Sequence, residues 1–222
     1  MKIWIIITTS LIATNYQERI TEYINGITSF LQTFKDPKYK IVIVENHSKL
    51  KNPISFYHRT FLDQFKIPVL YTKNNSIMKK TVNYGIPELL DIFDCIKHFN
   101  IQDDDFIIKA TGRYIINKDS PFFEVIDNLE TKPYSAVVRF NQFDNPPSLT
   151  KTNNCVSGMI GLKCKYVKQI ELPGLEYSIE NASEMKWAKV INTIEDSEIF
   201  FIEKLGLSIK PMALWNWYYT DI

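Results

Sequence analysis

Residues 103–116 read DDDFIIKATGRYII and join an acidic turn, a short apolar run and a basic exit that contains a glycine. The run DFIIKA, residues 105–110, has the length of a buried strand, and a segment of helical period precedes it. Short apolar runs that alternate with helices are typical of parallel strands joined by crossover helices. The stretch therefore predicts a strand of a parallel sheet with different chemistry at its two ends.

The same alternation runs through the residues before this stretch. Three further apolar runs are expected to form strands, namely KIWIIIT at 2–8, YKIVIVE at 39–45 and PVLYT at 68–72. Between the strands, apolar residues recur at helical spacing and predict helices over 16–34, 54–65 and 82–99. The expected fold class is α/β, with a mostly parallel, Rossmann-like central sheet flanked by helices.

The second half of the chain is less regular. Strands are expected at YSAVVRF, residues 134–140, and at CVSGMIGL, residues 155–162, with a loop containing two prolines between them. Helices are expected over 184–192 and 196–205, and the aromatic tail LWNWYY is expected to pack on the core. The length of 222 residues suits one domain, residues 1–222, whose halves 1–116 and 117–222 share the sheet.

Composition limits the classes of function. The formal net charge is +1, so no extended basic surface and no nucleic-acid partner are expected. The three cysteines, Cys95, Cys155 and Cys164, lack metal-binding spacing, which indicates reduced, buried thiols. No segment has the apolar length of a transmembrane span, and the N-terminal run, broken by Thr8 and Thr9, is interpreted as a strand rather than a signal peptide. A cytoplasmic protein is expected.

The two ends of the 105–110 strand are expected to have different roles. In an open parallel sheet, ligands bind outside the carboxyl ends of the strands, near the point where strand order reverses. Asp103, Asp104 and Asp105 lie at the amino end of the strand, away from that edge. We therefore expect them to form a solvated turn rather than a metal site.

The strand exits carry the groups that an anionic or nucleotide ligand needs. The exit of the 105–110 strand supplies Lys109, Thr111, Gly112, Arg113 and Tyr114. The glycine allows close backbone approach, and the planar guanidinium suits phosphate. The earlier strands supply Thr8, Thr9 and Ser10, then Glu45 and Asn46, and then Lys79, Lys80, Asn83, Gly85 and Glu88.

Several of these groups have an ordinary structural explanation as well. Glu45 and Asn46 are suited to reading a nucleobase or ribose, and an Asx turn explains them equally well. Lys79 and Lys80, before a helix N-terminus, are suited to a diphosphate, and a solvated basic turn is an equal alternative. The sequence leaves both pairs of alternatives open.

Three segments, in this order, resemble one family. VIVENHS at 42–48, KKTVNYGIPELL at 79–90 and FIIKATGRYII at 106–116 are similar to the nucleotide-sugar-binding half of GT-A glycosyltransferases. The likeness is nearest to small viral and bacterial capsule-type enzymes with an N-x-G-x-x-E-L helix and a K-x-[ST]-G-R-Y motif. It extends over about 140 residues from the N-terminus.

The resemblance implies a glycosyltransferase with a nucleoside-diphosphate sugar as donor, a UDP-sugar being favoured, and a glycan or lipid-linked acceptor. It places Glu45 and Asn46 near the nucleoside, and Lys79, Lys80 and Arg113 near the diphosphate. Most members hold Mn or Mg with a D-x-D motif at the end of the fourth strand, where this chain has K-A-T-G-R-Y. A divalent metal is in doubt, because lysine and arginine can also stabilise a leaving diphosphate.

The second half is expected to bind the acceptor. By resemblance, Ser157, Gly158 and Met159 lie beside the donor sugar. Arg139 and Asn141 follow the strand at 134–140 and are placed to face the donor, and a surface ion pair is an equal alternative for Arg139. Inverting transfer needs a carboxylate that deprotonates the acceptor hydroxyl. Asp196 is preferred, and the full set of candidates is Glu180, Glu184, Glu195, Asp196 and Glu198.

Other functions are weighed against this one. A sugar-1-phosphate nucleotidyltransferase needs a G-x-G-T-R loop after the first strand, and TTSLIATN, residues 8–15, has no glycine. A dinucleotide-dependent oxidoreductase needs G-x-G-x-x-G, which follows no predicted strand. The alternative is a catalytically inactive glycan- or nucleotide-binding module on the same fold.

Overall fold

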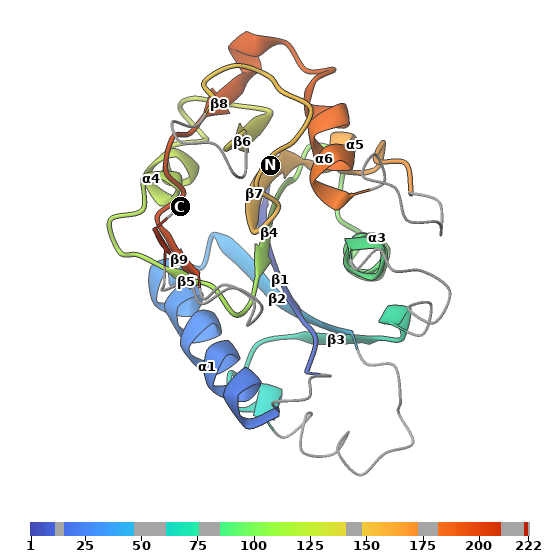
Figure 1. The fold of residues 1–222 in the computed structure, drawn as a ribbon, viewed down its shortest axis with the longest axis vertical. Helices are drawn as coiled ribbons and strands as arrows, with labels where there is room; N and C mark the ends of the chain where they lie inside the picture. Colours follow the sequence, from blue (N-terminus) through green and yellow to red (C-terminus); the bar gives the residue numbers. More distant parts are fainter. Residues whose placement is uncertain are drawn as a thin grey trace.

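The computed structural model describes residues 1–11, 16–46, 61–75, 85–140, 148–172, 182–209 and 220–221. Its centre is a seven-stranded sheet with the order β3-β2-β1-β4-β7-β6-β8 (Figure 1). The parallel part consists of β1 (Ile3–Thr9), β2 (Tyr39–Asn46), β3 (Val69–Thr72) and β4 (Phe106–Thr111). The α/β class and the four strands predicted for the first half are confirmed.

Beyond β4 the sheet contains one reversed strand. β7 (Met159–Lys163) is antiparallel to both β4 and β6 (Ala136–Val138), and β6 pairs in parallel with β8 (Ile199–Phe201). The helix predicted over 196–205 is wrong, because only Asp196–Glu198 is helical, as a short 3₁₀ turn. The residues of β8 are β-branched or aromatic and complete the open edge beside β6.

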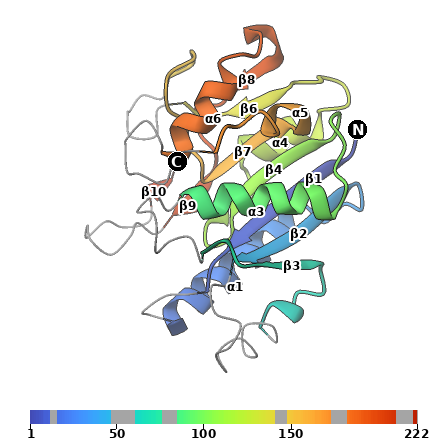
Figure 2. The same cartoon turned by 90° about the vertical axis from the view of Figure 1, so that its right-hand side faces the viewer.

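Helices cover both faces of the sheet (Figures 1 and 2). One face carries α1 (Tyr16–Thr33) and α4 (Pro121–Asp127), and the other carries α3 (Gly85–His98), α5 (Cys164–Val167) and α6 (Ser183–Ile191). Side chains alternate along each strand, so Ile5 packs in the core beside α1 and Ile6 in the core beside α3. No helix in the described ranges has the length and apolarity to cross a membrane.

The predicted helices over 16–34, 82–99 and 184–192 are confirmed to within a few residues by α1, α3 and α6. Most of the predicted helix at 54–65, the two-proline loop and the aromatic tail lie outside the described residues.

A second, three-stranded sheet was not predicted. It contains β5 (Ile115–Ile116), β9 (Leu207–Ile209) and β10 (Thr220–Asp221) in antiparallel pairs. Ile116 and Leu207 join the core on the α1 and α4 side. Strands of two or three residues carry little sequence pattern, yet this sheet fixes the turn between β4 and β5.

The acidic triplet lies at the amino edge of the sheet, as expected. Asp103 and Asp104 are exposed, and Asp103 forms a surface ion pair. Asp105 is buried instead, and its carboxylate accepts hydrogen bonds from the Lys2 N–H at 2.8 Å and Trp4 Nε1 at 3.2 Å. The expectation of a solvated turn is therefore wrong for Asp105, which anchors the start of β1.

The strand order reverses beside β1. The chain proceeds outward through β2 and β3 and then returns to β4, on the other side of β1. The carboxyl ends of β1 and β4 therefore border the crevice in which open α/β sheets bind ligands. The register pairs Thr8 with Thr111 and Thr9 with Glu45, so residues from three strand ends meet there.

Candidate functional site

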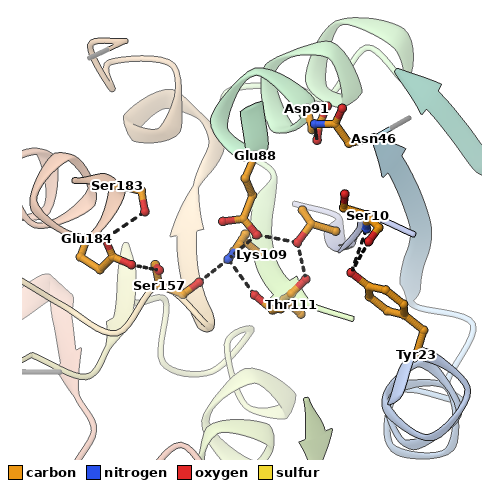
Figure 3. Close-up of polar contacts among 12 residues, drawn as sticks. Ser10, Tyr23, Asn46, Glu88, Asp91, Lys109, Thr111, Ser157, Ser183 and Glu184 are labelled. Carbon is orange, nitrogen blue, oxygen red and sulfur yellow. Dashed lines mark hydrogen bonds and ion pairs between the residues drawn. The ribbon is translucent and has the colours of Figure 1, made fainter. Parts of the chain in front are cut away.

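A buried lysine connects the strand ends at the crevice (Figure 3). Lys109 of β4 has a side chain that is only 1% exposed, and its ammonium pairs with Glu88 Oε1 at 2.8 Å. It also donates to Thr111 Oγ1 at 3.1 Å and to the carbonyl oxygen of Ser157. All three of its N–H groups therefore have partners. Contrary to expectation, Lys109 does not offer a free ammonium to a donor and instead positions its neighbours.

Glu88 links this lysine to β1. It lies in the first turn of α3, where the helix dipole favours a carboxylate, and its side chain is 25% exposed. The Thr8 hydroxyl donates to Glu88 Oε1 at 2.7 Å and lies 3.2 Å from the Ala110 carbonyl oxygen. The structure thus brings together Thr8, Glu88 and Lys109, which the sequence placed at three separate strand exits.

Glu45 is fully buried rather than open to a ligand. Its Oε2 accepts a hydrogen bond from Thr9 Oγ1 at 2.5 Å, and its Oε1 accepts one from the Leu11 N–H at 3.1 Å. Burial raises the pKa of Glu45 to about 7, and the two hydrogen bonds oppose the rise. Glu45 therefore fastens the segment after β1 to the end of β2, and direct contact with a nucleoside is not supported.

A buried hydrogen-bond cluster that the sequence analysis missed surrounds Asp91 of α3. Its carboxylate accepts from Asn46 Nδ2 at 2.6 Å, Thr72 Oγ1 at 2.5 Å and Asn74 Nδ2 at 2.8 Å. Burial raises the pKa of Asp91 to about 7, against the effect of these bonds. The Asn46 Oδ1 accepts the Asn75 N–H at 2.6 Å, so both ends of the Asn46 amide are already occupied.

A sequence signal for Asp91 exists. It lies four residues from Pro87 and four from Cys95, and both of these residues are buried in α3. A carboxylate in such a helical row must find hydrogen-bond donors inside the fold, because an unpaired buried charge is unfavourable.

Tyr23 of α1 holds the segment that follows β1. Its hydroxyl oxygen accepts a hydrogen bond from the Ser10 N–H at 2.8 Å, and Ser10 Oγ accepts one from Asn75 Nδ2 at 2.9 Å. Burial, followed by the charge of Glu45, raises the pKa of Tyr23, whereas the hydrogen bond with the Ser10 backbone lowers it. Arg113 is half-buried in the turn that leaves β4.

The turn that leaves β4 packs closely on both neighbouring strands. The Gly112 N–H donates to the Thr8 carbonyl oxygen at 2.9 Å, and a Cβ at Gly112 would lie 2.9 Å from Ile7 Cγ2. The Tyr114 ring lies against Gly158, where a Cβ would approach ring carbon Cε2 to 2.6 Å. Residues predicted for the donor side and for the acceptor side therefore touch at this turn.

Glu184 is the candidate base that lies at this edge. It is half-buried in the first turn of α6, and its Oε1 accepts a hydrogen bond from Ser157 Oγ at 2.8 Å. Its Oε2 accepts one from Ser183 Oγ at 3.1 Å. A carboxylate accepts about four hydrogen bonds, so each oxygen can accept one more. Figure 3 shows the resulting line of contacts from Glu184 through Ser157 to Lys109.

The other described candidates for the base lie elsewhere. The turn Asp196–Glu198 precedes β8, which runs parallel to β6, so both residues lie at the amino edge of the sheet. Asp196 forms an ion pair with Lys151 at 2.7 Å, and Glu198 accepts a hydrogen bond from the Ser135 hydroxyl. Glu195, which directly precedes this turn, is exposed. The structure therefore separates the preferred candidate, Asp196, from the crevice.

Three further predicted site residues belong to described elements. Gly85 begins α3, Met159 is buried in the core, and Arg139 ends the β6 segment at the ligand edge. Outside the described residues lie Lys79, Lys80, Asn83, Asn141 and Glu180.

The described residues do not suit a divalent metal at the exit of β4. The groups there are the ammonium of Lys109, the hydroxyl of Thr111 and the guanidinium of Arg113, whereas Mg²⁺ prefers carboxylate oxygens. Within the described ranges, no group of three or more His, Cys, Asp or Glu residues could hold a metal ion.

No protein-family model and no curated protein sequence matches the chain. Among solved structures, S. aureus TarS residues 1–349 in complex with UDP has a TM-score of 0.53 and 12% sequence identity. The match covers 99% of this chain but only 59% of that one. The likeness shows that the chain shares the fold of the matched part of TarS.

Two further solved structures are similar over most of their length. A protein assigned as a nucleotide-diphospho-sugar transferase from Desulfovibrio desulfuricans G20 matches with a TM-score of 0.49 and 12% identity, over 91% of this chain and 80% of that one. Mouse xyloside xylosyltransferase 1, in its apo form, matches with a TM-score of 0.48 and 11% identity, over 90% and 84% of the two chains.

Proposed function

We propose that the chain is a glycosyltransferase that transfers a sugar from a nucleoside-diphosphate sugar, a UDP-sugar being favoured, to a glycan or lipid-linked acceptor. The fold, shared with a protein that binds UDP, and the reversal of strand order at the carboxyl ends of β1 and β4 support a nucleotide site. The observation that carries the proposal is the position of Glu184. This half-buried carboxylate accepts hydrogen bonds from two hydroxyls, one of them on Ser157, just before β7 and beside the carboxyl end of β4. The proposal includes a cytoplasmic location and kinship with viral or bacterial enzymes.

Arg113 is the proposed contact for the donor diphosphate. It is half-buried in the turn that leaves the carboxyl end of β4, and its guanidinium is 5.4 Å from the Tyr114 ring centroid. A guanidinium binds phosphate oxygens through two parallel N–H groups. The sequence motif adds Lys79 and Lys80 to this role. These cations would stabilise the negative charge that develops on the leaving nucleoside diphosphate.

Glu184 is the proposed general base. The acceptor hydroxyl oxygen forms a bond to the anomeric carbon while the bond from that carbon to the diphosphate oxygen breaks on the opposite face. The diphosphate leaves with the electron pair of the broken bond, and Glu184 takes the proton of the attacking hydroxyl. Displacement from the opposite face gives inversion at the anomeric carbon.

Lys109 is proposed to hold the donor-binding residues and the general base in fixed positions relative to each other. Its ammonium holds Glu88, which binds Thr8 of β1, and it holds the carbonyl of Ser157, whose hydroxyl orients Glu184. One buried cation thus fixes the donor crevice and the base relative to each other. Reactions that need alignment of two substrates gain most from such fixed geometry.

The substitution Glu184→Gln tests this assignment. The amide is nearly isosteric but cannot take a proton, so we expect turnover to fall by about 10²- to 10⁴-fold with little change in UDP affinity. Turnover is measured as release of UDP from a panel of UDP-sugars, with water as the acceptor, and affinity is measured by calorimetry.

Asp196→Asn is the matched control, because Asp196 lies at the amino edge of the sheet. We expect this variant to retain wild-type turnover. Loss of turnover in Asp196→Asn but not in Glu184→Gln would refute the assignment of the base. Binding of UDP-sugars by the wild type without any turnover would instead indicate an inactive binding module.

A further inference from the structure

A buried arginine on the acceptor side of the sheet has no described counter-charge. Arg139 follows β6 and is 7% exposed. Its Nε donates to the Glu203 carbonyl oxygen at 2.9 Å, whereas its Nη1 is buried without a hydrogen-bond partner. None of the ion pairs formed between described residues includes this guanidinium. Burial lowers the pKa of Arg139.

Such an arrangement is unfavourable in the free protein. A guanidinium that loses its water needs a counter-charge, and each buried N–H needs an acceptor. Nearly all buried polar groups in native proteins are satisfied, so an exception calls for a specific explanation. Here Nη1 has neither a counter-charge nor an acceptor among the described residues, and a bound anion would provide both.

The position of Arg139 separates it from the donor crevice. The pairing of Val137 with Gly161 sets Arg139 level with Met159, and Met159 pairs with Ala110 of β4. Neighbouring strands are about 4.8 Å apart, so the Arg139 backbone lies about 10 Å from β4. Arg139 also follows the alternation of Val137, which faces the α1 and α4 side, whereas Lys109 follows Ile107 toward α3.

Arg139 adjoins the segment that orients the proposed base. Its carbonyl oxygen accepts the Val156 N–H at 2.9 Å. The next residue, Ser157, donates its hydroxyl hydrogen bond to Glu184. The backbone of Arg139 thus lies beside Ser157, whereas its side chain faces the α1 and α4 side and Glu184 belongs to α6 on the other side. An acceptor that binds beside Glu184 would reach Arg139 by crossing this edge of the sheet.

We propose that Arg139 binds an oxyanion of the acceptor, a carboxylate or a phosphate, and that the acceptor is therefore acidic. The inference rests on the proposed function, since it assumes that an acceptor binds beside Glu184. The planar guanidinium suits both oxyanions, because it can present two parallel N–H groups to two oxygen atoms. The unpartnered Nη1 provides one of these donors.

Thermal unfolding with defined small probes tests the inference. The acidic probes are methyl β-D-glucuronide, which carries a carboxylate, and methyl phosphate, and the neutral probe is methyl β-D-glucoside. At least one acidic probe is expected to raise the Tm of the wild type, because a ligand that binds the native state stabilises it. The neutral probe is expected to leave the Tm unchanged, and the two acidic probes distinguish a carboxylate from a phosphate.

Two variants connect the effect to Arg139. Arg139→Met is expected to abolish the response to the acidic probe, and its own Tm is expected to equal or exceed that of the wild type, because an uncompensated buried charge is removed. Lys189→Met is the control; it removes one positive charge from an exposed ion pair with Glu171 and should respond like the wild type. If Arg139→Met does not fold, Arg139→Lys, which keeps the charge but lacks the fork, should weaken acidic-probe binding at least about tenfold.

The remaining outcomes overturn one proposal or the other. The inference fails if neither acidic probe raises the Tm of the wild type, or if Arg139→Met still responds. It also fails if loss of Arg139 weakens UDP binding in calorimetry instead, which would make Arg139 a donor residue. If the acidic probe binds through Arg139 but UDP does not bind the wild type, the anion site stands and the proposed glycosyltransferase function fails.

Discussion

Two buried carboxyl groups, Glu45 and Asp91, connect the carboxyl ends of neighbouring strands through hydrogen bonds. Glu45 joins β2 to the segment after β1, and Asp91 joins α3 to the ends of β2 and β3. Burial raises the pKa of each to about 7. Their hydrogen bonds shape the backbone around the site, so their effect on a ligand is indirect.

The pKa of Glu45 has a consequence for stability. A carboxyl group with a raised pKa in the folded state binds its proton more tightly there than in the unfolded chain. Its contribution to the free energy of unfolding is fully present below the unfolded pKa, near 4.5, and is lost as pH rises through the folded value of about 7. The contribution of Asp91 to the free energy of unfolding also decreases as pH rises, because its pKa is raised as well.

We expect Glu45→Gln to reduce this pH dependence. The amide does not titrate, and its oxygen can still accept the Leu11 N–H. Between about pH 5 and pH 8, the free energy of unfolding should fall less in the variant than in the wild type, by up to about 3 kcal/mol. Urea denaturation at each pH measures the difference. Glu124→Gln, at an exposed position, should follow the wild type. Parallel curves for Glu45→Gln and the wild type would contradict the prediction.

At the scale of elements, α1 packs directly against the turn that leaves β4. A Cβ at Gly26 would lie 2.1 Å from the Gly112 carbonyl oxygen and 2.8 Å from that of Tyr114. Ser29 Oγ, one turn further along, accepts the Ile116 N–H at 3.0 Å. The helix therefore sets the backbone path of the turn that presents Arg113.

Gly26→Ala is expected to destabilise the protein and weaken UDP binding. Alanine at an exposed helix position would stabilise by about 1 kcal/mol relative to glycine. The backbone clash reverses this here, and we expect a loss of about 1–3 kcal/mol. Thermal unfolding and calorimetry with UDP measure the two effects. Asn25→Ala, at an exposed position of the same helix, should keep or raise the Tm. Equal Tm values for both variants would show that α1 tolerates a side chain at this turn.

Some elements could be predicted better than others, for physical reasons. The periods of α3 and α6 are visible because each helix buries one face over several turns. β8 is a run of three residues, and apolar runs this short fit a strand or a buried helix equally well. Its identity depends on the free edge of β6, which belongs to a different part of the chain.

At the scale of the whole molecule, the two halves share one sheet. β4 of the first half pairs with β7 of the second half, and β5 pairs with β9. The contact between Lys109 and Ser157 crosses the same boundary within the site. Separation of the two halves would expose the paired edges of β4, β5, β7 and β9, and each half would lose part of its core.

We therefore expect the chain to unfold in a single transition. Calorimetric and van't Hoff enthalpies should agree, as for a two-state domain. UDP at about 100 times its Kd should shift the whole transition upward, with a stabilisation of about 2.7 kcal/mol. Differential scanning calorimetry with and without UDP checks both points. Two transitions, of which only one responds to UDP, would show that the halves are independent.

The sequence by itself determined the α/β class and the direction of the first four strands, and so it assigned Thr8, Glu88 and Lys109 to one edge of the sheet. It could do so because apolar periodicity and strand ends are local properties. Only the tertiary structure decided which of these groups are already paired. Lys109 has a partner for each of its N–H groups, and Glu45 is fully buried with both oxygens hydrogen-bonded, whereas Arg139 has an unpartnered N–H group. Asp196 lies at the opposite edge because β8 pairs with β6. Pairing between distant segments depends on packing geometry, which no local pattern encodes.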